Sequence, residues 1–161
     1  MLKVDSSRQR MLDINPDIQV DTYNEAFTST NARRIAKDYD LIIDGTDNFP
    51  TRYLINEKIQ KPGIPFIYGG VLGLMGMVTL VRPGSGPCLK CLFPQAPPPK
   101  KFPVLGTTPG IIGVIEAHEA IKYLTGIGEI LAGRLLVFNG QEMKFSEIVI
   151  EKNPECEVCS R

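Results

Sequence analysis

The sequence predicts an α/β fold with a mixed sheet. Short apolar segments typical of strands alternate with longer segments of helical periodicity. Residues 40–46, DLIIDGT, form a compact apolar run typical of a strand buried on both faces of a parallel sheet. Of the 161 residues, 43% are hydrophobic, which is enough for one ordinary core. We therefore expect a single domain over residues 1–161.

The first 60 residues are predicted to alternate between helix and strand. The predicted elements are a helix over 3–15 that ends before Pro16, a half-buried strand over 17–23, a short helix from Thr28, the strand over 40–46 and a helix over about 51–60. This order of helices and strands is that of βαβ units.

The second part of the chain continues the sheet. Strands are predicted over 65–71 and 76–81, an exposed proline-rich loop over 93–103, a helix over 109–126, and strands over 134–140 and 145–151. Pro109 suits the first turn of its helix and Gly126 suits the end.

The charge balance argues against nucleic acid and anionic membranes as partners. Eighteen Lys and Arg face eighteen Asp and Glu, and no run of like charge stands out. There is no apolar stretch long enough to span a membrane, and the polar N-terminal residues do not resemble a signal peptide. We expect a cytoplasmic protein.

The four cysteines form two CxxC pairs, Cys88 with Cys91 and Cys156 with Cys159. Two such pairs complete a tetrahedral shell of four thiolates around Zn²⁺, and a closed shell of this kind is structural. Zinc would then attach the C-terminal tail to the segment that follows the sheet. The alternatives are redox pairs or free thiols, but a redox motif needs only one pair.

Asp44 and Asp47 lie at the carboxyl end of the strand predicted over 40–46. Open α/β sheets bind ligands at this edge, where a carboxylate can hold Mg²⁺ on a nucleotide phosphate. The alternative is a turn in which Asp and Asn cap the next helix and no ligand is needed. Pattern alone favours the cap. Arg52 suits either a phosphate contact or a solvated position on the helix.

Five segments resemble one family. They are DLIIDGTDNFPTRYLIN, PFIYGGVLGLMGMVTLV, GPCLKCLFP, GIIGVIEAHEAIKYLTG and NPECEVC. In this order they resemble the second part of the E1-like adenylating enzymes that include ThiF, MoeB and HesA.

The resemblance implies a Rossmann-like, doubly wound fold that binds ATP and Mg²⁺ and adenylates the C-terminal glycine of a ubiquitin-like sulfur-carrier protein. Asp47 matches the aspartate that the family associates with Mg²⁺, and Asn48 matches its neighbour at the nucleotide site. Lys3 matches a lysine that contacts phosphate. With the resemblance, the nucleotide interpretation of Asp47 overtakes the cap.

The sequence also departs from the family pattern. Residues 1–161 contain no glycine-rich turn between a strand and a helix, so we expect an incomplete fold without the N-terminal nucleotide-binding half. The chain would then form a homodimer or a complex with a separately encoded N-terminal half. No cysteine lies between Cys91 and Cys156, which argues against a thioester or persulfide step. The competing hypothesis is a non-catalytic zinc module that binds a carrier or another protein.

Overall fold

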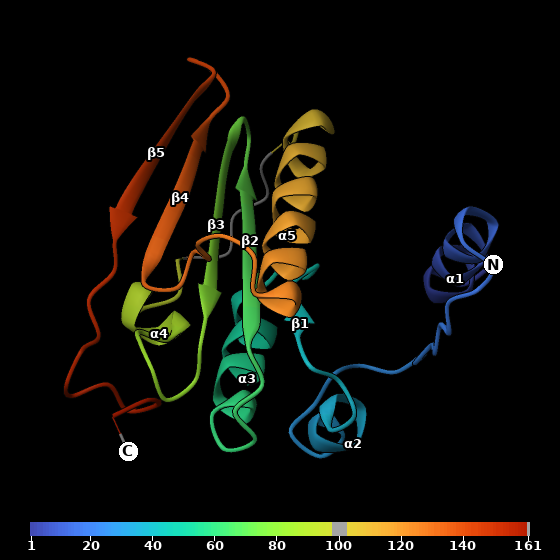
Figure 1. Cartoon of the computed structure of the whole chain (residues 1–161), viewed down its shortest axis with the longest axis horizontal. Coiled ribbons are helices and arrows are strands. Elements are labelled where there is room, and N and C mark those ends of the chain that lie inside the picture. Colours follow the sequence, from blue (N-terminus) through green and yellow to red (C-terminus); the bar gives the residue numbers. More distant parts are fainter. Residues whose placement is uncertain (98–102, 161) are drawn as a thin grey trace.

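The computed structural model describes residues 1–97 and 103–160 of the chain. Its centre is a five-stranded sheet in the order β1-β2-β3-β4-β5 (Figure 1). The strands are β1 (Ile42–Ile43), β2 (Phe66–Leu72), β3 (Met75–Val81), β4 (Arg134–Asn139) and β5 (Lys144–Val149). β1 pairs parallel with β2, and the remaining neighbours pair antiparallel. The mixed sheet predicted from the sequence is therefore confirmed.

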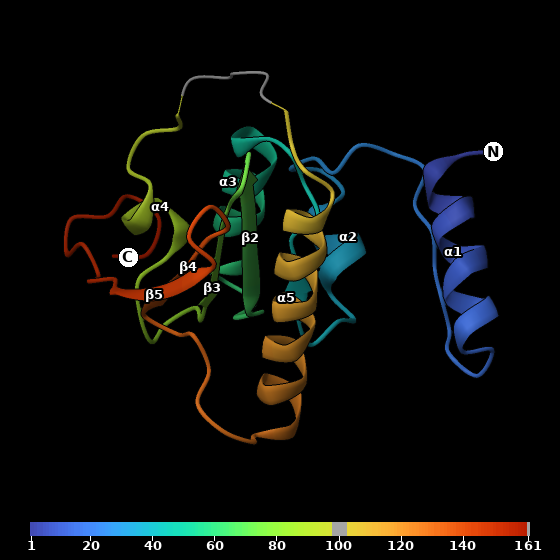
Figure 2. The same cartoon turned by 90° about the horizontal axis from the view of Figure 1, so that it is seen from above.

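Helices cover both faces of this sheet. α3 (Phe49–Ile59) and α4 (Leu89–Leu92) lie on one face, and α5 (Thr107–Thr125) lies on the other (Figure 2). Because side chains of β2 alternate between faces, Phe66 packs toward α3 while Ile67 packs toward α5. The two remaining helices are α1 (Lys3–Ile14) and α2 (Ala32–Ala36).

Each face of the sheet has its own apolar core. On the α3 side the core includes Ile55 and Ile59 together with Leu89 and two of the cysteines. On the α5 side, Ile112 packs so close to Gly76 that a β-carbon there would lie 2.3 Å from it. Glycine is therefore the residue that lets α5 approach β3.

The helix predicted over 109–126 is α5, and both of its terminal signals are confirmed. Pro109 lies in the first turn, where a missing backbone N–H removes no helical hydrogen bond. Gly126 ends the helix in the left-handed conformation, with a φ of 70°, and its N–H donates to Lys122 O at 2.9 Å.

Two predictions about strands are wrong. Residues 17–23 form no strand, and the run over 40–46 contributes only the two residues of β1. Ile43 is 51% exposed rather than buried on both faces. Both errors have the same cause, because a strand needs a hydrogen-bonded neighbour on each side to be buried. In the described part of the chain, residues 17–23 pair with no strand and β1 is an edge of the sheet.

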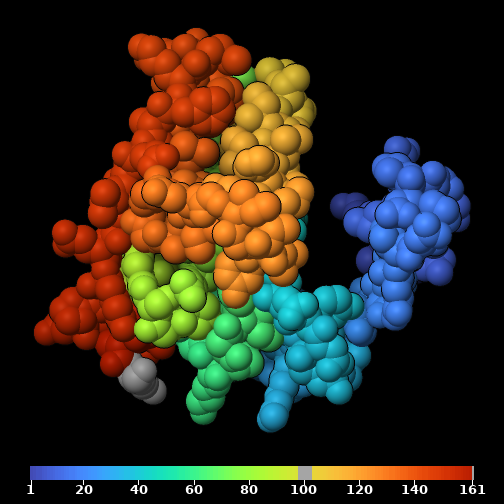
Figure 3. All heavy atoms as spheres, viewed as in Figure 1, coloured from blue at the N-terminus to red at the C-terminus, as the bar shows by residue number. Residues whose placement is uncertain are grey.

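The N-terminal helix lies apart from the sheet. α1 forms as predicted over 3–15 but buries none of its residues, and the space-filling view shows it separated from the main body (Figure 3). The proline-rich loop predicted over 93–103 falls partly at 98–102, outside the described residues. Within the described ranges, no helix has the length and apolar character needed to cross a lipid bilayer.

Candidate functional site

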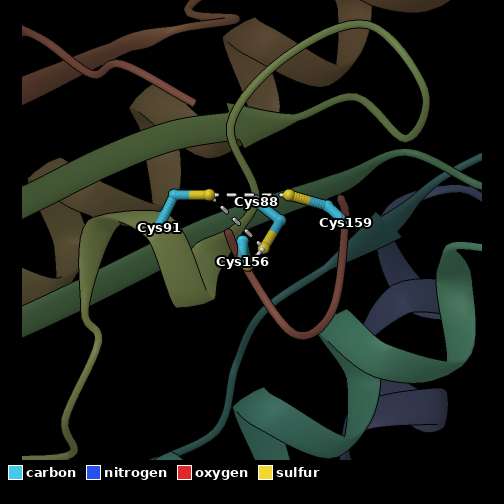
Figure 4. Close-up of side chains that lie close together, drawn as sticks. All are labelled: Cys88, Cys91, Cys156 and Cys159. Atoms are coloured by element: carbon cyan, nitrogen blue, oxygen red, sulfur yellow. Dashed lines mark hydrogen bonds between the residues drawn. The ribbon is translucent and has the colours of Figure 1, made fainter. Parts of the chain in front are cut away.

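The four cysteines converge, although residues 92–155 separate the two pairs in the sequence. We call Cys88, Cys91, Cys156 and Cys159 the four-cysteine cluster. Their sulfur atoms point toward one another (Figure 4) and all lie within 4.8 Å of each other. The Cys91 and Cys159 sulfurs are 3.5 Å apart, those of Cys88 and Cys156 are 3.7 Å apart, and those of Cys88 and Cys91 are 4.0 Å apart.

These separations fit one metal ion. Four sulfurs placed tetrahedrally at about 2.3 Å from Zn²⁺ are about 3.8 Å from one another. The donor set, four thiols with no carboxylate or imidazole among them, is the soft set that zinc shares with few other ions. The cluster therefore has both the chemistry and the spacing to hold a metal.

Local backbone turns place each pair of thiols. Cys88 precedes α4 and its carbonyl accepts from the Cys91 N–H at 3.0 Å, which turns both side chains the same way. In the tail, the Cys156 carbonyl accepts from the Ser160 N–H at 3.1 Å. Two residues between the thiols are therefore sufficient for each pair to face one point.

The surroundings shift the pKa values of the thiols in the cluster in different directions. Burial raises the pKa of Cys88, although the side-chain amide of Asn56 opposes that rise. Burial also raises the pKa of Cys156, but hydrogen bonds from the Cys159 and Val158 amide N–H groups, together with those to the Cys88 and Cys159 thiols, outweigh burial and bring the pKa to about 7. Burial, followed by hydrogen bonding to Cys91, raises the pKa of Cys159. Amide donors thus already favour a thiolate at Cys156.

Lys90 lies between Cys88 and Cys91 in the sequence and beside the cluster in the structure. Its Nζ is 3.4 Å from Glu157 Oε1 in the tail and lies 4.5 Å from the centre of the Tyr53 ring. Tyr53 in turn donates to the Phe93 carbonyl at 2.8 Å. The cation therefore links both halves of the cluster and supplies positive charge next to four potential thiolates.

The second region of interest is the turn that follows β1, residues 44–48. Asp47 and Asn48 are both exposed there. Asn48 caps α3, since its Oδ1 accepts from the Thr51 N–H at 2.9 Å. Its Nδ2 donates to Asp47 Oδ1 at 3.2 Å. The predicted helix cap is therefore present, and on the same turn the Asp47 carboxylate is exposed to solvent.

Asp44 has a different role from Asp47, because its side chain is fully buried. Arg52 Nε donates to Asp44 Oδ2 at 2.6 Å, and Arg52 Nη2 donates to the carbonyls of Thr46 at 2.6 Å and Gly69 at 2.9 Å. Thr46 donates to the other Asp44 oxygen through its N–H and its hydroxyl. The solvated interpretation of Arg52 is wrong, and this buried pair fixes the turn to β2.

Glu116 of α5 lies against Gly69 of β2, on the other face of the sheet from α3. It is 7% exposed, and its Oε1 has no hydrogen-bond partner among the described residues. A β-carbon at Gly69 would lie 2.4 Å from this carboxyl group. Burial, and to a lesser extent the nearby Asp44 carboxylate, raises the pKa of Glu116 to about 7, although Arg52 opposes the rise.

Glu116 predicts a pH dependence of stability. The pKa of Glu116 in the folded protein, about 7, lies above its ordinary value of 4.5. Protonated Glu116 therefore adds to the free energy of unfolding in full below pH 4.5, and this stabilisation is lost as the pH rises to about 7. We expect urea unfolding to show a loss on the order of 2 kcal/mol between pH 5 and pH 8, after discounting for solvent screening.

The variant Glu116→Gln should lack this loss, because an amide does not titrate. Glu129→Gln is the control, since Glu129 is 91% exposed. A Glu116→Gln protein with the same pH profile as the wild type would contradict the assignment.

The structure brings some predicted residues together and not others. The four cysteines meet, and Asp47 lies beside Asn48. Lys3 is exposed on α1, which stands away from the sheet in Figures 1 and 2. The isolated chain thus does not place Lys3 beside the turn. His118 is exposed on α5.

Sequence reasoning did not single out the buried Asn56 or Glu116, and it left Arg52 open between two roles, neither of them the buried ion pair. Glu116 had a local signal, because it follows the core residue Ile112 by one helical turn and so shares its buried face. Arg52 and Asn56 likewise share a face of α3 with core residues, but the pattern does not name their partners, which lie on the turn after β1, on β2 and at the start of α4.

The fold and the four-cysteine cluster define the class of protein. The family model described as ThiF matches residues 1–158, and the chain belongs to the ThiF family. The expected E1-like membership is thereby confirmed.

Several relatives are similar in sequence over nearly the whole chain. A sulfur carrier protein adenylyltransferase of Thermus thermophilus is 38% identical, over 95% of this chain and 60% of its own length. The SAMP-activating enzyme E1 of Haloferax volcanii is 38% identical, over 98% of this chain and 60% of its own length. The adenylyltransferase and sulfurtransferase MOCS3 of Drosophila yakuba is 39% identical, over 99% of this chain and 37% of its own length. The chain thus spans 60% or less of these relatives.

Solved structures share the fold at low sequence identity. E. coli MccB, in a crystal structure with ATP, has a TM-score of 0.85 at 17% identity and covers 99% of this chain and 52% of its own. PaaA has a TM-score of 0.75 at 19% identity and covers 94% of this chain and 48% of its own. These likenesses confirm the α/β architecture.

Proposed function

We propose that this chain is part of an enzyme that uses ATP to adenylate the C-terminal glycine of a ubiquitin-like sulfur-carrier protein. The observation that carries the proposal is the exposed Asp47 carboxylate at the carboxyl end of β1, on a turn fixed by the buried Asp44–Arg52 pair. Ligands of open α/β sheets bind at this edge. The names of the sequence relatives supply the substrate class.

The proposed reaction needs positioning and charge neutralisation more than covalent chemistry by the protein. An oxygen of the carrier carboxylate attacks the α-phosphorus of ATP, the bond to the bridging oxygen breaks, and pyrophosphate leaves with that electron pair. Mg²⁺, when bound, neutralises charge on the phosphates. Asp47 would hold the ion, Asn48 would keep Asp47 oriented, and Lys3 would contact phosphate once α1 is brought to the sheet.

We further propose that the four-cysteine cluster binds a structural Zn²⁺. The support is the match between its sulfur separations and a tetrahedral thiolate shell. All four positions are taken by protein ligands, so no position is open for a substrate. The ion would hold the C-terminal tail to α4, and thereby to the core beneath α3.

An exposed strand edge and an apolar surface among the described residues support the proposal that a further protein part binds here. β1 offers a free strand edge with Ile43 half exposed, and one face of α5 exposes Val114, Ile121 and Leu124 at 71%, 59% and 59%. Exposed edges and apolar patches of this kind are typical of interfaces. We propose that the glycine-rich N-terminal half of the family domain, separately encoded or not, covers them, or that a second copy does.

The experiment combines the chain with the glycine-rich half taken from a ThiF-family relative. We expect the two proteins to elute together from a size-exclusion column, and the mixture to exchange pyrophosphate with ATP when a carrier is present. The chain alone should bind ATP weakly and show no exchange, because the hydrogen bonds to phosphate and ribose come from the other half.

The competing function is a non-catalytic module that binds a carrier through the same surface. It is favoured only by the lack of a glycine-rich turn in residues 1–161. A mixture that binds the carrier but fails to exchange pyrophosphate would support this alternative. Exchange by the chain alone would instead show that its nucleotide site lies elsewhere.

A further inference from the structure

Asn56 is the most deeply buried polar side chain that the proposed chemistry does not use. It lies on α3, facing α4, and its exposed fraction is 0%. Its Oδ1 accepts from the Leu89 N–H at 2.9 Å, and Leu89 directly follows Cys88. Because Leu89 is itself fully buried, this hydrogen bond ties the first metal-binding thiol to α3.

The nitrogen of the same side-chain amide, Asn56 Nδ2, is buried and has no hydrogen-bond acceptor among the described residues. Buried amide donors rarely lack a partner, so such a group calls for an acceptor. The hydrogen bond from Leu89, the residue that directly follows Cys88, holds this amide beside the Cys88 end of the cluster. A thiol is a weak acceptor, whereas a metal-bound thiolate is a strong one.

We propose that Asn56 is a positioning residue of the metal site, whose Nδ2 donates a hydrogen bond to the Cys88 thiolate when the four-cysteine cluster holds zinc. One amide then does two things: it fixes the backbone next to the ligand and stabilises the ligand's charge. Partners of this kind hold ligands in place and raise metal affinity. The inference rests on the proposed zinc site.

The proposal also connects the two regions of the molecule. α3 begins at the turn that carries Asp47 and holds Arg52 in its first turns and Asn56 further along. Arg52 anchors this helix to Asp44, and Asn56 anchors it to the cysteine loop. Zinc would therefore fix the position of the helix whose N-terminus bounds the proposed nucleotide edge.

The first test compares zinc release from the wild type and Asn56→Asp to a chromogenic chelator. Aspartate keeps an acceptor for Leu89 but loses the donor and adds negative charge next to the sulfur. We expect release roughly 10- to 100-fold faster, and a shifted sulfur-to-metal absorption band in the cobalt form. Thr79→Val is the matched control, because it removes one buried hydrogen bond, to Leu131 O, without touching the cluster.

Thr79→Val should lose stability but keep its zinc release rate. A folded Asn56→Asp protein with wild-type release would overturn the inference, whereas a wild type without zinc would overturn the metal site instead. A second measurement needs no variant. In the wild type loaded with an NMR-active cadmium isotope, the Asn56 side-chain N–H should show coupling to cadmium through the sulfur. Coupling from backbone N–H groups of the cluster but none from Asn56 would also overturn it.

Discussion

Replacing Cys156 by serine is expected to abolish tight zinc binding and to destabilise the whole fold. Cys156 is buried and belongs to the core beneath α3 together with Cys88 and Leu89, so the tail cannot detach without exposing that core. We expect the free energy of unfolding to fall by on the order of 4 kcal/mol, because a metal that binds only the folded chain adds its binding energy to stability. The melting temperature should drop by about 10 °C.

Differential scanning calorimetry and elemental analysis measure the two effects together. Adding a chelator to the wild type should reproduce the melting curve of Cys156→Ser and should leave the variant unchanged. Ser160→Ala is the control, since it alters an exposed tail residue whose hydroxyl only donates to the Cys156 carbonyl. An unchanged melting curve for Cys156→Ser would exclude a structural role for the cluster.

Replacing Asp47 by alanine should abolish adenylation when the glycine-rich half is present. We expect carrier-dependent exchange to fall at least about 1000-fold, because the proposed carboxylate for Mg²⁺ is removed from the transition state. Stability should change by less than about 0.5 kcal/mol, since the side chain is exposed and accepts only from Asn48.

Two controls separate the nucleotide role from the cap. Asn48→Ala removes the hydrogen bond to Thr51 N–H and should cost about 1 kcal/mol of stability with a smaller loss of exchange. Asp38→Ala removes a carboxylate that is 77% exposed and should change neither property. If Asp47→Ala keeps full activity, the turn serves only to begin α3.

Local patterns predicted most of the helices and the cysteine cluster. The amphipathic period, Pro109 and Gly126 located α5, because the signals that start and end a helix lie within a few residues of its ends. The CxxC spacing identified each pair of thiols for the same reason, since two residues bring both sulfurs to one side of a turn.

The failures concern partners that lie far away in the sequence. The segment over 17–23 alternates like a strand, yet it forms none because no neighbouring strand pairs with it within the described ranges. Ile43 is apolar like a core residue and is exposed because β1 is an edge. Alternation of apolar and polar residues indicates which face of a strand would be buried, but the strand forms only where a neighbouring strand pairs with it.

By itself, then, the sequence determined the α/β class, the two CxxC pairs and the Asp47–Asn48 turn, because each depends on residues close together in the chain. Only the tertiary structure decided that Arg52 pairs with buried Asp44, that Glu116 meets Gly69 across the sheet, and that Asn56 holds Leu89 beside the cluster. A buried polar group is stable only when protein groups replace its hydrogen bonds to water, and here those groups lie on other elements of the fold.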